Sequence, residues 1–255
     1  MEATSRRVDI GGRLSLANET STVLRRYVWR WVLEDDPDVP RREVEALRFG
    51  ARSGLPVPEV LAADIDGASV GDGVPALLMT LVPGRPVSVP DLRALATVGA
   101  GIHAIDASPL AYRYFPWYRD ALADAPPGVT DQRLWRRAIE IWHTQMPEYR
   151  PGFLHRDFHP GNVLWRRGEA HVVDWANACA GPSECDVAHC RDNLVHLSGF
   201  DAADLFLRRY REVTGADYHP YWEIASVLEH SPSSFDAQRV AISETRLRAA
   251  LAQYT

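Results

Sequence analysis

A single segment, residues 154–165, limits what this chain can fold into more than any other feature. It reads Leu-His-Arg-Asp-Phe-His-Pro-Gly-Asn-Val-Leu-Trp, which places His155, Asp157 and Asn162 in the pattern H-x-D-x-x-x-x-N. A second carboxylate, Asp174, ends the next apolar stretch. Asp, Pro, Gly and Asn also occur in ordinary surface loops, but such a loop requires neither the histidine nor a hairpin that delivers a second aspartate. The pattern therefore predicts a strand, a loop and a hairpin that gather two carboxylates and one amide.

These side chains match what phosphoryl transfer requires. Charge builds up on the non-bridging oxygens of the transferred group and is neutralised by Mg²⁺ ions, while a carboxylate orients the attacking hydroxyl. Mg²⁺ prefers oxygen ligands, so an amide and a carboxylate suit it. Kinase-type catalytic loops use the same spacing. We therefore interpret Asp157 as the catalytic carboxylate, and Asn162 and Asp174 as metal ligands.

A strand cation and a helix carboxylate form a second candidate pair. Arg25 lies in a stretch rich in β-branched and apolar residues, and Glu43 opens the helix expected next. Kinase-type folds pair such groups to hold the cation over the α- and β-phosphates. Arg26, Arg42 and Glu45 compete for these roles, because a shift of one residue turns a strand side chain to the opposite face. We select Arg25 and Glu43.

Composition and charge exclude several classes of protein. A chain of 255 residues that is 46% hydrophobic can bury a sizeable core, as one large domain or two small ones. A net charge of −6 argues against nucleic acid as a partner. The chain shows neither a charged-then-apolar leader nor an apolar run that could span a membrane, so we expect a soluble, cytoplasmic protein. The three cysteines lack a C-x₂-C pair and are expected to be free thiols rather than zinc ligands.

The chain divides into a part rich in strands and a part rich in helices. We expect strands over residues 13–16, 21–27, 60–63 and 76–82. One helix is expected to start at Asp38 as its N-cap. Pro83-Gly84-Arg85-Pro86 then breaks the pattern. We place the domain boundary there, between a lobe of residues 1–82 and a lobe of residues 83–255.

The second part is mainly helical and carries the hairpin. Apolar residues recur at helical spacing over residues 92–105 and 131–145. A hairpin is expected from strands 162–165 and 170–174. Further helices are expected from about Asp186, Ala202, Tyr221 and Asp236.

Two residues near the catalytic segment have competing interpretations. Alternate strand residues share a face, so His155, Asp157 and His159 also fit a zinc hydrolase, although Pro160 ends the strand at once. We favour His155 as a buried, hydrogen-bonded brace of the loop. Asp186 either braces the catalytic loop or caps a helix that begins near Val187, and a structural role is favoured.

Two further features are weaker signals. Gly11-Gly12 is the candidate phosphate loop, although two glycines before a strand often form only a turn. An aromatic cluster could wall a pocket for a cation, although such clusters usually serve packing. Its members are Tyr112, Tyr114, Phe115, Trp117 and Tyr118.

With these residues in place, the chain resembles the aminoglycoside phosphotransferase family. Residues 155–164 look like its catalytic loop, and Val173-Asp174-Trp175 looks like its metal-binding strand end. The remaining similar stretches are Val23-Leu24-Arg25-Arg26-Tyr27, Arg42-Glu43, Gly54-Leu55-Pro56-Val57-Pro58, Leu78-Met79-Thr80, Gly101-Ile102-His103-Ala104-Ile105-Asp106, Gly181-Pro182 and Asp186-Val187-Ala188.

The resemblance implies an α+β, two-lobed fold of the protein-kinase type, with a small, abbreviated N-terminal lobe and a larger helical lobe. It implies that ATP, or GTP, binds between the lobes with Mg²⁺, and that Met79 and Leu81 contact the nucleotide. The γ-phosphoryl would pass to a hydroxyl of a small molecule, such as an antibiotic or a metabolite. Arg25 stands where better-known members have Lys, which keeps the charge but changes the donor geometry.

The Arg25 departure and the short lobe keep a second hypothesis open, a kinase-like binding protein with little transferase activity. The intact Asp157, Asn162 and Asp174 argue against it. Neither the acceptor nor the oligomeric state is indicated by the sequence.

Overall fold

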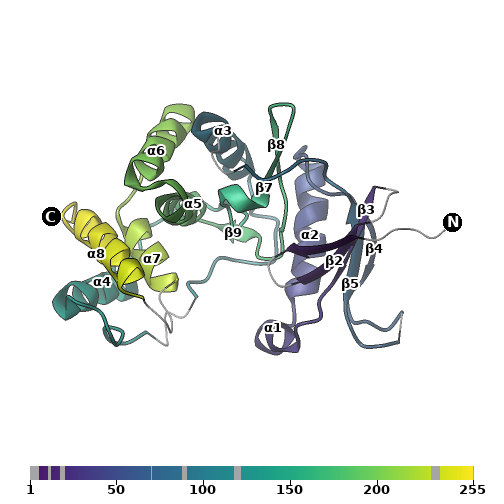
Figure 1. The fold of residues 1–255 in the computed structure, drawn as a ribbon, viewed down its shortest axis with the longest axis horizontal. Coiled ribbons are helices and arrows are strands. Elements are labelled where there is room, and N and C mark those ends of the chain that lie inside the picture. Colours follow the sequence, from purple (N-terminus) through teal and green to yellow (C-terminus); the bar gives the residue numbers. More distant parts are fainter. Residues whose placement is uncertain are drawn as a thin grey trace.

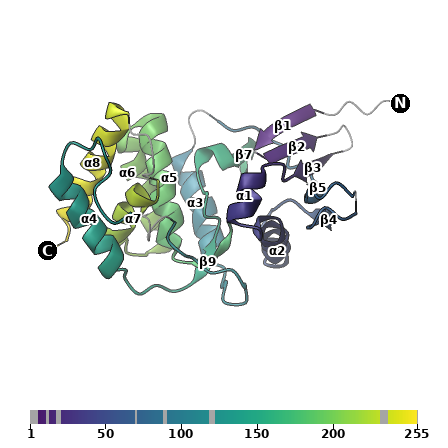
Figure 2. The ribbon, with the colours of Figure 1, turned by 90° about the horizontal axis from the view of Figure 1, so that it is seen from below.

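The computed structural model describes residues 6–10, 13–17, 21–69, 71–87, 91–117, 122–230 and 236–254. These residues form two lobes, a small one built around a sheet and a larger, mainly helical one (Figure 1). The sheet and helix α2 (Val39–Arg52) lie toward one end of the molecule. Helices α4 (Gln132–Thr144) and α8 (Ala237–Leu251) lie toward the other end in both views (Figures 1 and 2). The expected two-lobed α+β architecture is confirmed.

The small lobe contains an antiparallel sheet of five strands in the order β1-β2-β3-β5-β4. The strands are β1 (Arg6–Ile10), β2 (Arg13–Ala17), β3 (Thr22–Arg26), β4 (Val60–Asp64) and β5 (Ala76–Thr80). In β3, Val23 and Arg25 are buried while their neighbours are half-buried, as alternation along a strand requires. The predicted short lobe thus includes a paired β1 and β2. Gly11-Gly12, the candidate phosphate loop, lies outside the described residues.

Helix α2 packs against β4 and β5. It buries Val44 and Leu47 in the core that the sheet shares. Asp38 precedes the helix as predicted, but its side chain makes no capping hydrogen bond to the described residues. The chain leaves α2 through Gly54, whose φ of +82° suits glycine. A short helix, α1 (Arg30–Asp35), was not predicted from the sequence, because none of its residues is fully buried, so its helical apolar pattern is weak.

The large lobe is built from six helices among the described residues. They are α3 (Leu92–His103), α4, α5 (Ser183–Ser198), α6 (Phe200–Thr214), α7 (Tyr221–Glu229) and α8. Aspartates at the N-caps of α3, α4 and α8 accept backbone hydrogen bonds, which explains where these helices begin. The four helices predicted near Asp186, Ala202, Tyr221 and Asp236 begin within three residues of those positions.

Two short antiparallel pairs lie where the lobes meet. One joins β6 (Gly152–Leu154) to β9 (Cys179–Gly181). The other is the predicted hairpin of β7 (Val163–Arg166) and β8 (Glu169–Val172). The segment that leaves the sheet also pairs with this hairpin, because Arg85 and Trp165 exchange backbone hydrogen bonds of 3.2 and 2.9 Å. The connection between the lobes is therefore anchored on the hairpin beside the catalytic loop.

Two further expectations concern the state of the cysteines and the presence of a membrane-spanning helix. All three cysteines are free, as predicted. Burial raises the pKa of Cys179 to about 12, so this thiol is unreactive near neutral pH. Among the described residues, no helix combines the length and the apolar character needed to cross a bilayer.

Candidate active site

One buried carboxylate, Asp186, holds the backbone of the segment that contains Asp157. Asp186, in the first turn of α5, accepts hydrogen bonds from the backbone N–H groups of His155 and Arg156, both at 2.7 Å. It also lies 3.2 Å from His103 Nε2. Burial by itself would raise the pKa of Asp186, but the hydrogen bond and charge of His103 hold it below its ordinary value. Asp186 is therefore an ionised brace for the catalytic loop.

The geometry shows that Asp186 braces the loop and does not cap the helix. Helix α5 begins at Ser183 rather than near Val187, so Asp186 lies inside the first turn and does not cap the helix. Arg156, which it holds, has a φ of +67°, a conformation that is costly for a residue with a side chain. The hydrogen bonds to Asp186 offset this cost and fix the turn before Asp157.

His155 connects the loop to the segment that carries Asp174. Its ring is fully buried, and its Nδ1 accepts from the Asp157 N–H at 3.3 Å. Its Nε2 therefore carries the proton and donates to the Val173 carbonyl at 3.0 Å. Both ring nitrogens are used by the backbone, as expected of a brace, so His155 is not available as a zinc ligand.

Asp157 and Asn162 are in direct contact. Asn162 Nδ2 donates to Asp157 O at 2.9 Å and to Asp157 Oδ2 at 3.0 Å. This uses the donor end of the amide and leaves Asn162 Oδ1 as the atom that can bind a cation. The Asn162 carbonyl also accepts from the Val173 N–H at 3.0 Å, which ties the loop to the Asp174 segment.

Asp174 lies just beyond strand β8, which ends at Val172. Its φ of +69° is unusual for a residue other than glycine, and such strain concentrates at functional sites. Asp174 Oδ1 accepts a hydrogen bond of 2.9 Å from Arg25 Nη1. The aspartate of the large lobe thus meets the arginine of the small lobe.

The register of β3 and α2 selects the predicted cation and carboxylate. The side chains of Arg25 and Glu43 are each 1% exposed, and Arg25 Nη1 donates to Glu43 Oε1. Tyr27 OH donates to the other oxygen of Glu43. Arg26 faces away and pairs with Asp72 at the surface. Burial by itself would lower the pKa of Arg25, but the charges of Glu43 and Asp174 raise it above its ordinary value.

These side chains line one cleft between the lobes. The cleft has a volume of about 480 Å³, within the range of small-molecule sites. Its polar lining includes Arg25, Glu43, Asn162 and Asp174. The predicted nucleotide contacts Met79 and Leu81 line the same cleft from β5 and the segment that follows it.

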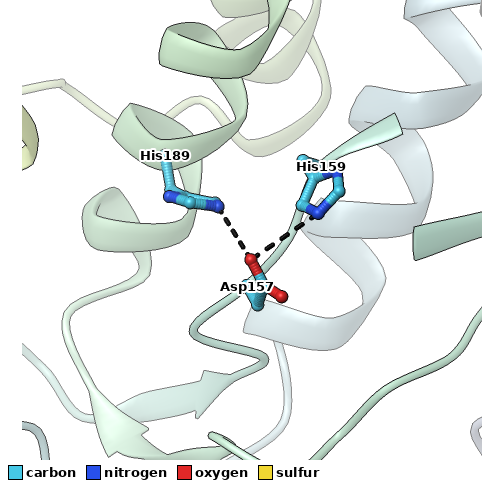
Figure 3. Close-up of side chains that lie close together, drawn as sticks. All are labelled: Asp157, His159 and His189. Carbon is cyan, nitrogen blue, oxygen red and sulfur yellow. Dashed lines mark hydrogen bonds and ion pairs between the residues drawn. The ribbon is translucent and has the colours of Figure 1, made fainter. Parts of the chain in front are cut away.

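Two histidines face Asp157 from different elements (Figure 3). His189 of α5 places Nε2 3.0 Å from Asp157 Oδ1, and His159 of the loop places Nε2 3.6 Å from the same oxygen. Burial by itself would raise the pKa of Asp157, but the hydrogen bond from His189 and the neighbouring imidazole rings hold it well below its ordinary value. Asp157 is therefore ionised near neutral pH, as a group that orients a hydroxyl must be.

The same three residues form the only metal-like cluster of His, Cys, Asp and Glu in the described part of the chain, with their ligand atoms within 4.8 Å of one another. His159 Nδ1, however, accepts a hydrogen bond of 3.0 Å from the Gly161 N–H, so the proton of the ring lies on Nε2. A nitrogen that carries a proton cannot bind a metal. The geometry therefore favours N–H donors around a carboxylate over the zinc site considered as an alternative.

The aromatic cluster encloses a cation that belongs to the protein itself. Arg156 is buried, and its guanidinium carbon lies 3.9 Å from the ring centre of Trp117 and 4.6 Å from that of Tyr114. Arg156 also pairs with Glu229 at 3.2 Å and donates to the Phe115 carbonyl at 3.0 Å. Tyr114 and Trp117 thus pack against the protein's own Arg156, in keeping with the favoured packing role; Tyr118 lies outside the described residues.

Three residues that contact the loop were not predicted from the sequence: His189, His103 and Glu229. His189 follows Asp186 at a spacing of three on α5, so the helical face that braces the loop also carries this ring. That spacing was the available signal. His103 and Glu229 come from other helices, and their contacts arise only on folding.

The profile of a family described as "Phosphotransferase enzyme family" matches residues 13–229, which is most of the chain. The search of the curated proteins found no match to this chain.

Several solved structures are similar in fold. A thermostable mutant of aminoglycoside phosphotransferase APH(4)-Ia, in ternary complex with ADP and hygromycin B, is 20% identical with a TM-score of 0.65, covering 98% of this chain and 93% of that one. Amicoumacin kinase hAmiN, in complex with AMP-PNP, Ca²⁺ and Ami, is 14% identical with a TM-score of 0.65, covering 98% and 88%. Aminoglycoside-3'-phosphotransferase of type VIII is 19% identical with a TM-score of 0.57, covering 96% and 93%.

At these identities the structures establish the fold, and they confirm the expected protein-kinase-like architecture. The family match spans both the sheet lobe and the catalytic loop. The chain belongs to the phosphotransferase enzyme family, and its fold is that of the aminoglycoside phosphotransferases.

Proposed function

We propose that this protein transfers the γ-phosphoryl group of ATP, in the presence of Mg²⁺, to a hydroxyl of a small molecule. The observation that carries the proposal is the cleft between the lobes. There the buried Arg25–Glu43 pair, Asp174 and Asn162 line one cavity, and Asp157 is hydrogen-bonded to Asn162 at its edge. GTP is the alternative donor nucleotide.

The donor atoms fit the hard cation that the proposal requires. Asn162 Oδ1 and the carboxylate of Asp174 are oxygen ligands, which Mg²⁺ prefers. When bound, the metal would neutralise charge on the phosphates. Arg25 Nη1 already donates to Asp174, so cation and arginine would share this carboxylate.

Arg25 offers a specific fit to the nucleotide phosphates. Its guanidinium lines the cleft, so phosphates bound there would meet its positive charge. The Glu43 carboxylate would hold the guanidinium in place.

Asp157 is proposed to orient the acceptor hydroxyl toward the γ-phosphorus. The segment after Asp174 is short, since β9 begins at Cys179 and α5 at Ser183. It therefore lacks the long activation segment on which protein kinases dock their substrates. This supports a small-molecule acceptor. The neighbours that bind hygromycin B and amicoumacin-type ligands support an antibiotic-like acceptor as one class to screen.

We also propose that the lobes divide at the predicted boundary, between residues 1–82 and 83–255. The exchange of hydrogen bonds between Arg85 and Trp165 supports it, because the chain is already attached to the large lobe at that point.

Calorimetric titration with AMP-PNP and Mg²⁺ tests the nucleotide site. We expect binding that requires the metal and that Asp174→Ala weakens at least about tenfold, because a charged ligand to the metal is lost. Asp217→Ala, a fully exposed aspartate outside the cleft, is the matched control and should bind as the native protein does.

Transfer is then tested with γ-labelled ATP and a panel of hydroxyl compounds that includes aminoglycosides, macrolides, choline-like amines, homoserine and sugars. Labelled product that disappears in Asp157→Ala supports the proposal. Metal-dependent binding without transfer to any acceptor would instead support the kinase-like binding protein.

A further inference from the structure

We propose that His189, held by His230, is a positively charged hydrogen-bond donor that positions the carboxylate of Asp157. The charge follows from a chain of hydrogen bonds and does not depend on the reaction. The role in catalysis rests on the proposed function. His189 is a positioning residue in this account, because it acts on the acceptor only through Asp157.

The chain of hydrogen bonds starts at a backbone carbonyl of α7. His230 Nδ1 lies 2.6 Å from Ser226 O, and a carbonyl oxygen only accepts, so Nδ1 carries a proton. The contact between His230 Nε2 and His189 Nδ1 needs one further proton, and the positive charge is better placed on His189, because that ring lies 3.0 Å from the Asp157 carboxylate. Burial, which lowers the pKa of His230, favours the same placement. His230 Nε2 must therefore accept from His189 Nδ1, which lies 2.9 Å away.

The second nitrogen of His189 meets a carboxylate. His189 Nε2 lies 3.0 Å from Asp157 Oδ1, a distance at which a lone pair facing an ionised oxygen would be repelled. A proton on Nε2 turns this contact into a charge-assisted hydrogen bond, one of the strongest kinds in proteins. Because Nδ1 also carries a proton, the ring is then an imidazolium.

A neighbouring amide, that of Asn193, could instead donate a hydrogen bond to Nε2 of His189. Asn193 Nδ2 lies 3.2 Å from His189 Nε2 and would donate to it if the ring were neutral. The same amide nitrogen already donates to the His189 carbonyl at 3.1 Å. A neutral donor at the longer distance competes poorly with an anion at the shorter one, so the carboxylate decides the protonation.

The other carboxylates near His189 are paired with arginines, so Asp157 is the anion with which His189 forms its hydrogen bond. Glu229, one residue before His230 on α7, pairs with Arg156 at 3.2 Å. Asp192, on the same helix as His189, pairs with Arg246 of α8. The titratable and charged groups around the two rings are Asp157, His159, Glu229, Asp192, Arg156 and Arg246.

The consequence for Asp157 is that both of its oxygens are held. His189 donates to Oδ1, and Asn162 Nδ2 donates to Oδ2 at 3.0 Å. These two donors fix the plane of the carboxylate and lower its basicity. Asp157 is thereby suited to orient a hydroxyl by accepting a hydrogen bond from it.

Long-range ¹H–¹⁵N spectra of the whole chain with ¹⁵N-labelled histidine report ring protonation directly. The chain has nine histidines, and His189→Gln and His230→Gln each remove one set of signals and so assign the two rings. Near neutral pH we expect His189 to carry protons on both nitrogens and His230 on Nδ1 alone.

Asp157→Asn is the discriminating variant, because an amide removes the charge and can itself donate to Nε2. We expect His189 to become neutral in it. His196→Gln is the matched control, since His196 lies on the same helix about two turns beyond His189, 4.0 Å from Asp192. It should leave the His189 signals unchanged.

A neutral His189 in the native protein would overturn the proposal, as would a ring that stays doubly protonated in Asp157→Asn. The spectra require neither ATP nor an acceptor. Failure of the protein to transfer phosphate would therefore be distinguishable from failure of this assignment.

Discussion

Arg25 Nη1 lies 2.9 Å from Asp174 Oδ1, and the same guanidinium donates to Glu43. One arginine of the small lobe thus neutralises a carboxylate of its own lobe and one of the other lobe. All three side chains are at most 5% exposed. This contact makes the stability of the protein depend on the residue that is proposed to hold the phosphates.

Arg25→Met should therefore destabilise the protein strongly, by about 3–5 kcal/mol, because it leaves two buried carboxylates without their cation. Urea unfolding followed by circular dichroism measures the loss. Arg26→Met is the matched control, since Arg26 is the neighbouring strand arginine and pairs with Asp72 at the surface. Equal losses in the two variants would show that the buried network contributes nothing beyond a surface pair.

Asp157→Ala should lower kcat by roughly 10²–10⁴ while AMP-PNP binding stays near the native value. The reason is that Asp157 is proposed to orient the acceptor and is not among the residues that line the cleft proposed to bind the nucleotide. Steady-state kinetics and calorimetry on the same preparation check this. Unchanged turnover would remove Asp157 from the mechanism.

Asp186→Asn should lower the free energy of unfolding by roughly 2–4 kcal/mol near neutral pH. Each oxygen of Asp186 accepts a backbone N–H, and an amide would turn one NH₂ group toward a donor. The pKa of Asp186 is depressed in the folded state, so its contribution is present above the ordinary aspartate pKa and is lost as the pH falls through the lower, folded value. The gap between native and variant protein should therefore close only in strong acid, as unfolding curves over a pH series would show. A gap that closed while the pH was still near neutral would contradict this.

Replacing two glycines of α3 by alanine should change the stability of the protein differently. A Cβ at Gly99 would lie 3.0 Å from Cε1 of Phe158, the residue after Asp157, whereas a Cβ at Gly101 would meet nothing within 4 Å. Gly101→Ala should raise the stability by about 0.5–1 kcal/mol through helix propensity. Gly99→Ala should not be stabilising, because the added Cβ would crowd the ring of Phe158. Melting temperatures of both variants decide it, and a higher melting temperature for Gly99→Ala than for Gly101→Ala would contradict the packing.

Local patterns account for what could be predicted. The spacing of His155, Asp157 and Asn162 places them on one loop, and helical periodicity located α3 and α4 to within about two residues. A strand pattern alone does not distinguish Arg25 from Arg26, because strand register depends on the partner strand. Helix α1 was not predicted, because it is short and none of its residues is fully buried, so its periodic signal is weak.

The sequence by itself predicted the two-lobed fold, and it predicted the loop and the oxygen ligands proposed for catalysis from residues close together along the chain. Only the tertiary structure decided which groups surround those residues. Arg25 and Asp174 are separated by 149 positions, Arg156 and Glu229 by 73, and His189 and Asp157 by 32. Contacts at such separations are set by how the helices and the sheet pack. For that reason the charge environment of Asp157 can be read from the folded chain and not from the motif that contains it.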